Sequence, residues 1–322
     1  MKKKIEILCT LGPASLNSKF LKFAKNKISL LRLNMSHIEI RNLKKNITFI
    51  QNKTKIPICI DTEGAQIRTK VKKKQKIKVN QTFKIYKDSK NKGLYPSSVF
   101  NKLKINDLLD IGFNDLKAKI IKKNKRFIVL KSTSSGILEN NKGIYVVNRA
   151  LTLNFLTEKD IEAINIAKGL GIKNFALSFT NTKQDVLRFK SLLPKQNKIY
   201  KLESKNAIKN LTSIIKEGNN FLIDRGDLSK EINIENIPIF QRKIINLSKK
   251  FKNKKVYIAT NFLENMVTNK YPTRGEANDI YSSLEMGASG LVLAAETAIG
   301  NYPDKTVLFL NKMIKVFRTI KI

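Results

Sequence analysis

The segment Lys198-Ile199-Tyr200-Lys201-Leu202-Glu203 is a short apolar run that ends in charged residues, and the repetition of such runs along the chain decides the fold. Successive side chains of a β-strand point to opposite faces, so Lys201 and Glu203 share one face of this run. A second carboxylate, Asp227, follows downstream. An ammonium group beside two carboxylates predicts cation-assisted chemistry on an anion.

Eight apolar runs recur along the chain, separated by segments with helix-like patterns. Strands that alternate with helices pair in parallel, so the eight units predict an α/β fold, a closed (β/α)8 TIM barrel. Thr157 precedes one helical pattern as a capping residue would, and Gly169 or Gly171 ends that pattern. The runs are Ile5 to Leu8, Ile28 to Leu33, Ile56 to Ile60, Ile172 to Leu177, Ile199 to Leu202, Phe221 to Ile223, Val256 to Ala259 and Leu291 to Leu293.

One interval breaks this rhythm after the third run. From about Lys70 to Asn148 the sequence has short strands and turns, such as Thr82 to Tyr86, Lys117 to Ile121 and Phe127 to Leu130. The sequence therefore predicts a catalytic barrel formed by residues 1–69 and 149–322, with a small inserted all-β domain at 70–148. A domain inserted after a barrel strand is well placed to act as a lid, or else it only decorates the fold.

Composition narrows the class of protein. A chain of 322 residues can bury a large core, and its 2 Cys and 1 His exclude a disulfide framework and a Cys/His zinc site. Any metal would therefore have oxygen ligands. The start Met1-Lys2-Lys3-Lys4 imitates a signal peptide, but Glu6 interrupts the short apolar stretch that follows. No long uncharged apolar run is present, so we expect no membrane partner and a cytoplasmic location.

The net charge of +38 raises the alternative of a nucleic-acid-binding protein. The lysines are spread along the whole chain among many Asn and Ile residues, as the codon bias of an AT-rich genome would produce. No helix-turn-helix, RRM or zinc-finger pattern accompanies them. We therefore expect no specific nucleic-acid partner.

Polar residues follow the predicted strands at their carboxyl ends, which is where barrel enzymes have their active sites. Arg32, Asn34 and Ser36 alternate along one face, as Lys201 and Glu203 do. This end of the barrel is therefore the predicted active site. The other polar ends are Cys9 to Ser15, Asp61 to Gly64, Ser178-Phe179, Asp224 to Asp227, Thr260 and Glu296-Thr297.

These polar ends resemble those of the pyruvate kinase family, and the resemblance covers essentially the whole chain. No single element is specific, but all of them occur in the family's order. The matching segments are Arg32-Leu33-Asn34-Met35-Ser36-His37, Asp61-Thr62-Glu63-Gly64-Ala65-Gln66-Ile67-Arg68-Thr69, Leu156-Thr157-Glu158-Lys159-Asp160, Arg225-Gly226-Asp227-Leu228, Ala259-Thr260, Pro272-Thr273-Arg274-Gly275-Glu276 and Glu296-Thr297-Ala298.

The resemblance implies a phosphotransferase of glycolysis that moves the phosphoryl group of phosphoenolpyruvate to ADP, giving pyruvate and ATP. It implies that Glu203 and Asp227 hold Mg²⁺ or Mn²⁺, and that Lys201 stabilises charge on the phosphoryl group and on the enolate. It further implies that Gly226, Asp227 and Thr260 bind the substrate carboxylate. Thr260 would also relay the proton to the enolate carbon. Arg32 and Arg68 would bind phosphates.

Two further sites follow from the resemblance. A K⁺ site would be built from four residues with hard oxygen ligands, although ordinary turn chemistry is the alternative for them. The nucleotide would bind near the loop at Gly12-Pro13, and Glu296 would be a structural anchor nearby. The K⁺ residues are Asn34, Ser36, Asp61 and Thr62. The nucleotide residues are Arg68, His37 and Lys142. For His37 and Lys142 the alternative is an ordinary solvated surface residue.

Several residues depart from the family's pattern. Gln66 stands where K⁺-dependent members have Glu and K⁺-independent members have Lys, so K⁺ dependence is open. Asp224 replaces a small residue, and it would add either repulsion toward an anionic substrate or a further metal ligand. The chain ends near Ile322, so we expect the family's C-terminal domain and its allosteric control by sugar phosphates to be absent. Further departures are Asn181, Thr182, Ser204, Ala294, Ala295 and Ile299.

Two alternatives to a pyruvate kinase stay open. A divergent paralogue on the same scaffold would perform metal-dependent enolate or 2-oxo acid chemistry without ADP. A non-enzymatic basic binding protein would instead bind random DNA tightly and in a salt-sensitive way. The oligomeric state is also open, a homo-oligomer included.

Overall fold

The computed structural model describes residues 4–319 apart from 88, 90, 113, 114, 150 and 152. The chain divides into two compact units. One comprises Met1–Gly64 with Glu158–Ile322, and the other is Ala65–Thr157. The predicted insertion, residues 70–148, falls within the second unit.

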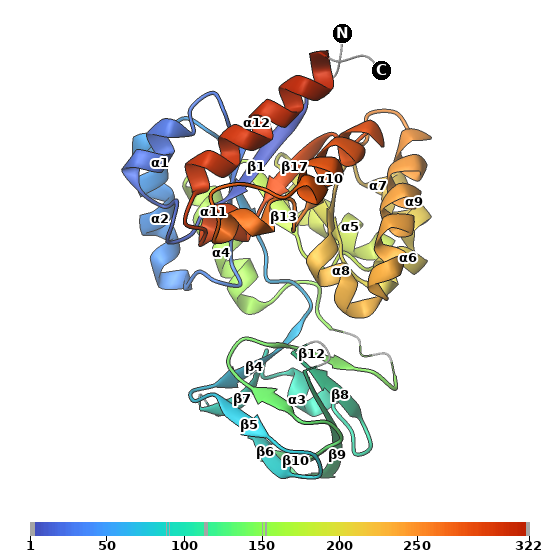
Figure 1. Cartoon of the computed structure of the whole chain (residues 1–322). Helices are drawn as coiled ribbons and strands as arrows, with labels where there is room; N and C mark the ends of the chain where they lie inside the picture. Colours follow the sequence, from blue (N-terminus) through green and yellow to red (C-terminus); the bar gives the residue numbers. More distant parts are fainter. Residues whose placement is uncertain are drawn as a thin grey trace. The chain divides into compact units, whose positions relative to one another are not determined.

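The first unit is a closed barrel of parallel strands in the order β1-β17-β16-β15-β14-β13-β3-β2 (Figure 1). Each neighbouring pair runs parallel. The predicted (β/α)8 barrel is confirmed, and each of the apolar runs overlaps one strand. The strands are β1 (Glu6–Thr10), β2 (Leu30–Asn34), β3 (Ile58–Asp61), β13 (Asn174–Leu177), β14 (Asn197–Leu202), β15 (Asn220–Asp224), β16 (Lys255–Ala259) and β17 (Gly290–Leu293).

Helices cover the outside of this barrel (Figure 1). In α2, the buried residues Leu43, Ile47 and Ile50 recur at helical spacing, so one face packs inward while lysines occupy the other. Among the described residues, no helix is both long enough and apolar enough to cross a membrane. The helices are α1 (Ser18–Phe23), α2 (Ile40–Lys53), α4 (Glu158–Gly169), α5 (Lys183–Leu192), α6 (Lys205–Lys209), α7 (Leu211–Glu217), α8 (Arg225–Glu231), η1 (Ile234–Asn236), α9 (Ile237–Lys249), η2 (Glu264–Val267), α10 (Arg274–Glu285), α11 (Ala295–Ala298) and α12 (Pro303–Thr319).

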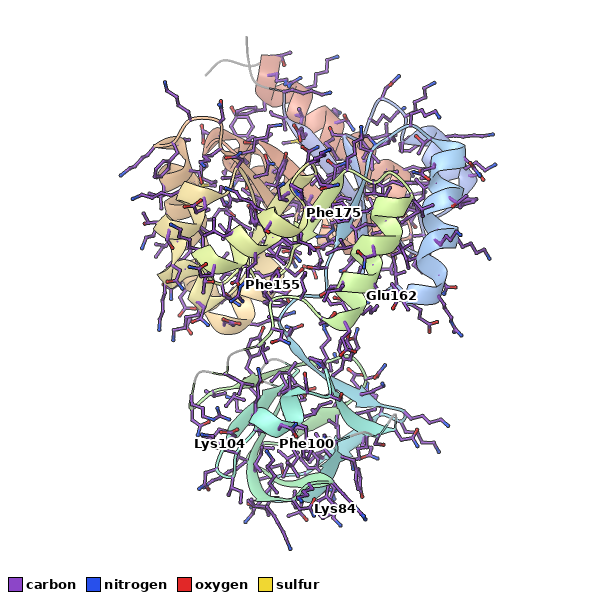
Figure 2. The ribbon with its side chains drawn as sticks, turned by 180° about the vertical axis from the view of Figure 1, so that it is seen from behind. Lys84, Phe100, Lys104, Phe155, Glu162 and Phe175 are labelled. Atoms are coloured by element: carbon purple, nitrogen blue, oxygen red, sulfur yellow. The ribbon has the colours of Figure 1, made fainter. Side chains whose placement is uncertain are left out.

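The barrel interior is filled by an apolar layer to which nearly every strand contributes. Phe175 of β13 is also fully buried, whereas Glu162 of α4 lies at the surface (Figure 2). Because side chains alternate along a strand, the residue two positions after each member of the layer continues along the same face toward the carboxyl end. The members are Leu8, Cys59, Ala176, Ile199, Leu222, Tyr257, Ala259 and Val292, with Leu30 packed against them.

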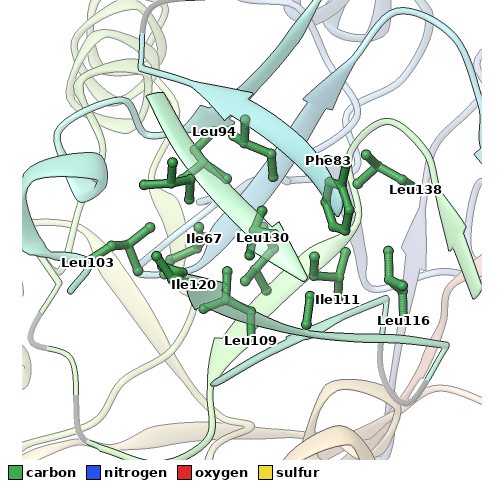
Figure 3. Close-up of a cluster of buried hydrophobic side chains, with 14 of the residues drawn as sticks. Ile67, Phe83, Leu94, Leu103, Leu109, Ile111, Leu116, Ile120, Leu130 and Leu138 are labelled. Atoms are coloured by element: carbon green, nitrogen blue, oxygen red, sulfur yellow. The ribbon is translucent and has the colours of Figure 1, made fainter. Parts of the chain in front are cut away.

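The second unit is built mainly of strands and has its own hydrophobic core (Figure 3). Its main sheet closes in the order β10-β6-β7-β4-β12-β8-β9, and β11 pairs with β5. One four-residue helix, α3, interrupts the strands. The elements are β4 (Ile67–Val71), β5 (Gln75–Ile77), β6 (Thr82–Tyr86), β7 (Lys92–Tyr95), α3 (Val99–Lys102), β8 (Leu108–Ile111), β9 (Leu116–Lys123), β10 (Phe127–Ser132), β11 (Gly136–Leu138) and β12 (Gly143–Val146).

Candidate active site

A ring of buried polar side chains lies at the carboxyl end of the barrel. Each member follows a residue of the apolar interior by two positions, as Lys201 follows Ile199 and Asp224 follows Leu222. The alternation of strand side chains therefore aims the ring into the barrel mouth. The members are Thr10, Arg32, Asp61, Ser178, Lys201 and Asp224.

Lys201 lies at the centre of this ring and is only 5% exposed. Its Nζ is 3.0 Å from Glu203 Oε2, 3.5 Å from Asp224 Oδ2 and 3.6 Å from Asp61 Oδ2. Nζ also donates a hydrogen bond to Ser178 Oγ at 3.2 Å. Burial alone would lower the pKa of Lys201, but the three carboxylates outweigh it and raise that pKa. The ammonium is therefore held protonated inside the barrel.

Arg32 is the second buried cation. Its Nη1 is 3.1 Å from Asp61 Oδ2, and its Nε donates to Thr10 Oγ1 at 3.0 Å. Thr10 in turn donates to the carbonyl of Leu293 at 3.0 Å. This chain of contacts across neighbouring strands fixes the guanidinium beside Lys201.

Glu203 is fully buried at the end of β14. Its Oε1 accepts a hydrogen bond from the Phe179 N–H at 2.6 Å. Burial raises the pKa of Glu203 to about 8; Lys201 opposes this shift, while the neighbouring carboxylates Asp227, Asp224 and Asp61 add to it. A further positive charge at this point would favour the carboxylate form of the side chain.

Three carboxylates form a candidate metal centre. One oxygen from each of Glu203, Asp224 and Asp227 lies within 4.8 Å of the others. Asp227 Oδ1 is also 2.7 Å from Lys230 Nζ, at the partly exposed side of the cluster. The donor set fits a hard divalent cation such as Mg²⁺ or Mn²⁺, which prefers carboxylate oxygens. Such an ion would also offset the like charges that raise the pKa of Glu203.

Gly226 and Thr260 lie together beside this cluster. The Gly226 N–H donates to Thr260 Oγ1 at 2.8 Å, and the Asp227 N–H donates to Asp224 Oδ1 at 3.4 Å. Thr260 has φ +74°, a conformation that β-branched residues rarely adopt. Strain of this kind concentrates at functional sites.

Arg225 holds that strained backbone in place. Its Nε and Nη2 donate to the carbonyl of Thr260 at 3.2 and 2.5 Å, and its Nη1 donates to both carboxylate oxygens of Asp279 at 2.9 and 2.7 Å. The guanidinium also lies 4.3 Å from the centre of the Phe262 ring. Arg225 therefore anchors the loop that carries Thr260.

The residues predicted for a K⁺ site meet where β2 and β3 end. Asn34 pairs with Asp61 in the strand register, and Asn34 Oδ1 accepts the Ser36 N–H at 3.0 Å. Thr62 Oγ1 accepts the Ser178 N–H at 3.0 Å, a contact between distant residues, so of these two contacts only that of Asn34 is local turn chemistry. Asp61 instead faces Arg32 and Lys201.

The predicted nucleotide residues do not all belong to one unit. His37 is an exposed residue of the barrel unit, whereas Arg68 and Lys142 belong to the second unit. Lys142 Nζ is 2.7 Å from Glu139 Oε1. Gln66, also of the second unit, is buried and donates to Tyr145 Oη at 3.1 Å. The predicted anchor Glu296 is buried in the barrel unit and accepts the Ala294 N–H at 2.7 Å.

Ser178 and Thr10 join the ring; both lie in the polar strand ends of the predicted active site, but neither was assigned a catalytic, substrate or metal role. Ser178 Oγ contacts both Lys201 and Asp61, at 3.2 Å each, and Thr10 holds Arg32. Both residues lie two positions beyond an interior apolar residue. Carrying the alternation through β1 and β13, as was done for Lys201, would have found them.

A cavity of about 1450 Å³ lies at the opposite end of the barrel, around the residues that precede the strands. Lysines such as Lys22, Lys25 and Lys53 line it, and Glu6 is the one acid among the described lining residues. The described lining of that end therefore lacks a cluster of carboxylates like the one around Lys201.

Comparison with known proteins agrees with this geometry. The family model described as pyruvate kinase, barrel domain, matches residues 2–307. The chain is 30% identical to a pyruvate kinase of Thermotoga maritima, an alignment that covers 99% of this chain and 73% of that protein. For the pyruvate kinase of Methanocaldococcus jannaschii the identity is 32%, with coverage of 98% and 70%, and for that of Staphylococcus saprophyticus it is 32%, with coverage of 95% and 55%.

The chain thus spans between about half and three quarters of the length of these relatives. The family model covers most of the chain, and the relatives align with nearly all of it. The resemblance seen in the strand-end segments is confirmed: the chain belongs to the pyruvate kinase family.

Proposed function

We propose that this protein transfers the phosphoryl group of phosphoenolpyruvate to ADP, giving pyruvate and ATP. The observation that carries the proposal is the buried Lys201 ammonium, which lies at the mouth of a pyruvate-kinase-family barrel beside carboxylates that fit a divalent cation. Phosphoryl transfer depends mainly on positioning and charge neutralisation, and this site provides both.

In this reaction the bond between phosphorus and the enol oxygen breaks, and a bond from phosphorus to an oxygen of the ADP β-phosphate forms. The enol oxygen keeps the electron pair, so an enolate results, and protonation of its terminal carbon gives pyruvate. Negative charge therefore develops on the transferring group and on the enol oxygen, where preorganised cations stabilise it.

Lys201 and Arg32 would provide that stabilisation. Both are buried, and both are kept charged by Asp61, whose Oδ2 lies 3.1 Å from Arg32 and 3.6 Å from Lys201. Their positions cost no reorganisation during the reaction, because the strands already fix them. A divalent cation bound by Glu203 and Asp227 would add charge neutralisation and orient the substrate.

Thr260, Gly226 and Asp227 would receive the substrate carboxylate. The Thr260 hydroxyl now accepts the Gly226 N–H, so binding would require an exchange of that hydrogen bond. Thr260 is also our candidate for relaying the proton to the enolate carbon, because it has the only hydroxyl in this carboxylate pocket formed by Gly226, Asp227 and itself.

The finer assignments belong to the same proposal. Arg68, His37 and Lys142 would bind the nucleotide, Arg68 would also grip phosphate, and Asn34, Ser36, Asp61 and Thr62 would bind K⁺. Gln66 carries no charge, so we leave K⁺ dependence to experiment. A lid function for residues 70–148, a cytoplasmic location and a homo-oligomer stay predictions.

Pyruvate formation from phosphoenolpyruvate, ADP and Mg²⁺ tests the proposal, with and without K⁺. The wild-type chain should form pyruvate, and omission of ADP should abolish the product. A matched control is Glu285→Gln, which removes an exposed carboxylate of α10 and should leave the rate unchanged.

A wild-type protein that forms no pyruvate at high concentration would contradict the proposal. Thermal unfolding with Mg²⁺ and phosphoenolpyruvate, with and without ADP, then separates the alternatives, because a ligand that binds the folded state raises Tm. A Tm that rises with phosphoenolpyruvate but ignores ADP would favour the divergent paralogue.

A further inference from the structure

We propose that Asp224 is a third protein ligand of the divalent cation that Glu203 and Asp227 would hold. This inference rests on the cation site of the proposed function and goes beyond it, because Asp224 stands where the family pattern has a small residue. The consequence is a site with three carboxylates in place of two.

The geometry of Asp224 supports this role. Asp224 Oδ2 lies 3.5 Å from Lys201 Nζ, and Glu203 Oε2 lies 3.0 Å from the same Nζ. The two oxygens therefore flank one ammonium from two neighbouring strands. One Asp227 oxygen lies within 4.8 Å of one oxygen of Glu203 and one oxygen of Asp224.

The two oxygens of Asp224 have different surroundings. Oδ1 accepts the Asp227 N–H at 3.4 Å, and so caps α8. Oδ2 lies on the Lys201 side of the cluster, 3.5 Å from Lys201 Nζ. The Asp227 N–H thus holds one oxygen of Asp224, while the second oxygen lies toward Lys201.

The charge of the ring supports the same conclusion. Arg32 and Lys201 carry two positive charges among Asp61, Glu203, Asp224 and Asp227, which carry four negative charges when ionised. The carboxylates outnumber the two buried cations, which leaves excess negative charge that a bound cation would reduce. Lys230 offsets part of it from the partly exposed side, where it contacts Asp227 at 2.7 Å. Because buried charge without compensation is costly, a third carboxylate favours occupation by such an ion.

Asp224 also affects an anionic substrate. Its Oδ1 accepts the Asp227 N–H, and Asp227 is one of the residues that the proposed function assigns to the substrate carboxylate. A carboxylate at this point repels phosphoenolpyruvate until a cation neutralises it. We therefore expect the cation to bind first, and phosphoenolpyruvate to bind poorly without it.

Direct Mn²⁺ binding to the full chain, without phosphoenolpyruvate or ADP, tests this inference. The electron paramagnetic resonance signal of free Mn²⁺ gives its Kd for wild type, Asp224→Ala and Asp224→Asn. Both variants should raise the Kd by about tenfold or more, because affinity follows the charge and number of ligands. Glu285→Gln removes one distant carboxylate and should leave the Kd unchanged.

Asp224→Asn guards against misfolding, because it keeps the size of the side chain and an oxygen that can cap α8. Circular dichroism confirms the fold of each variant before titration. A Kd that is unchanged or lower in the folded variants would overturn the inference, as would a wild-type chain that binds no Mn²⁺.

A second readout separates this inference from the proposed function. Calorimetry without metal should show tighter phosphoenolpyruvate binding to Asp224→Ala than to wild type, and the order should reverse when Mn²⁺ is present. If wild type forms no pyruvate while Asp224→Ala still raises the Mn²⁺ Kd, the proposed function fails and the role of Asp224 stands.

Discussion

Arg32 and Asp61 form a buried ion pair at the mouth of the barrel, with Nη1 and Oδ2 3.1 Å apart. Arg32 is 4% exposed and Asp61 is 0% exposed. Burial alone would lower the pKa of Arg32, but Asp61 and the nearby carboxylates raise it. The pair therefore contributes charge to the site and also supports the fold.

Replacing Arg32 tests whether its ion pair with Asp61 supports the fold. Arg32→Met should lower the free energy of unfolding by about 3–5 kcal/mol, because it leaves Asp61 buried with only Lys201 opposite. Arg41→Met is the matched control: Arg41 pairs with Glu39 at 2.5 Å, but both side chains are largely exposed, so its loss should cost about 0–1 kcal/mol. Urea unfolding measures both values, and equal costs would contradict the prediction.

Lys201→Met should reduce pyruvate formation by at least about 10²–10³-fold, the usual effect of removing one preorganised stabilising group. Metal should still bind, because Lys201 is a cation and contributes no ligand. Steady-state kinetics and a Mn²⁺ titration of the same preparation check the two parts. A variant that keeps most of its activity would remove Lys201 from the mechanism.

Gly64 is required where β3 leads into the second unit. It has φ +70°, and a Cβ there would lie 2.7 Å from the Ser178 backbone oxygen. Gly64→Ala should therefore destabilise the protein by more than about 2 kcal/mol. Gly169→Ala, at the end of α4 with nothing within 4 Å of the added Cβ, should instead stabilise it by about 0.4–1 kcal/mol. Thermal unfolding of both variants decides whether backbone geometry sets the requirement.

Asp107 links acid pH to the stability of the second unit. It is buried, accepts the Lys104 N–H at 2.7 Å, and pairs with Arg149 through both oxygens, at 2.6 and 2.7 Å. Burial alone would raise its pKa, but these hydrogen bonds outweigh it, so the pKa of Asp107 in the folded protein is lowered.

A lowered folded pKa stabilises the protein above the unfolded pKa of about 3.9, and this stabilisation is lost as the pH falls through the folded pKa. Asp107→Asn should therefore cost about 1–3 kcal/mol at pH 7, and the difference from wild type should shrink below about pH 4. Urea unfolding between pH 3 and pH 7 measures it. A difference that stays constant over this range would refute the linkage.

The alternation of apolar and polar residues predicted the barrel well, because six of its eight strands lead from an apolar interior residue to a buried polar residue at the carboxyl end. The same rule identified Lys201, Glu203 and Arg32, which lie on the inner faces of their strands. The rule also applies to Ser178 and Thr10, which follow the interior residues Ala176 and Leu8 by two positions. Sequence periodicity is therefore informative about inward-facing residues.

Contacts that depend on three-dimensional packing were beyond such a rule. The bidentate contact of Arg225 with Asp279 joins residues 54 positions apart, and the same Arg225 contacts the carbonyl of Thr260, whose φ is positive. The hydrogen bond from the Gly226 N–H to Thr260 Oγ1 likewise depends on the pairing of β15 with β16. Residue spacing along one strand does not predict these contacts, because they join residues of different elements.

Glu203 and Asp227 should differ in how their loss affects the metal requirement. Glu203→Gln keeps the oxygen that accepts the Phe179 N–H, so the local fold should persist while one ligand charge is lost. The Mg²⁺ concentration for half-maximal activity should rise at least about tenfold, since even outer-shell partners of a metal cost 10–100-fold when removed.

Asp227→Asn should raise the same Mg²⁺ concentration but also release Lys230, whose Nζ now contacts Asp227 Oδ1 at 2.7 Å. Lys230→Met separates the two effects: removing a cation that competes for Asp227 should lower the Mg²⁺ requirement, the opposite direction. Magnesium titrations of pyruvate formation for the three variants give the comparison. If Glu203→Gln and Asp227→Asn both kept the wild-type requirement, the carboxylates of this cluster would not be the metal ligands.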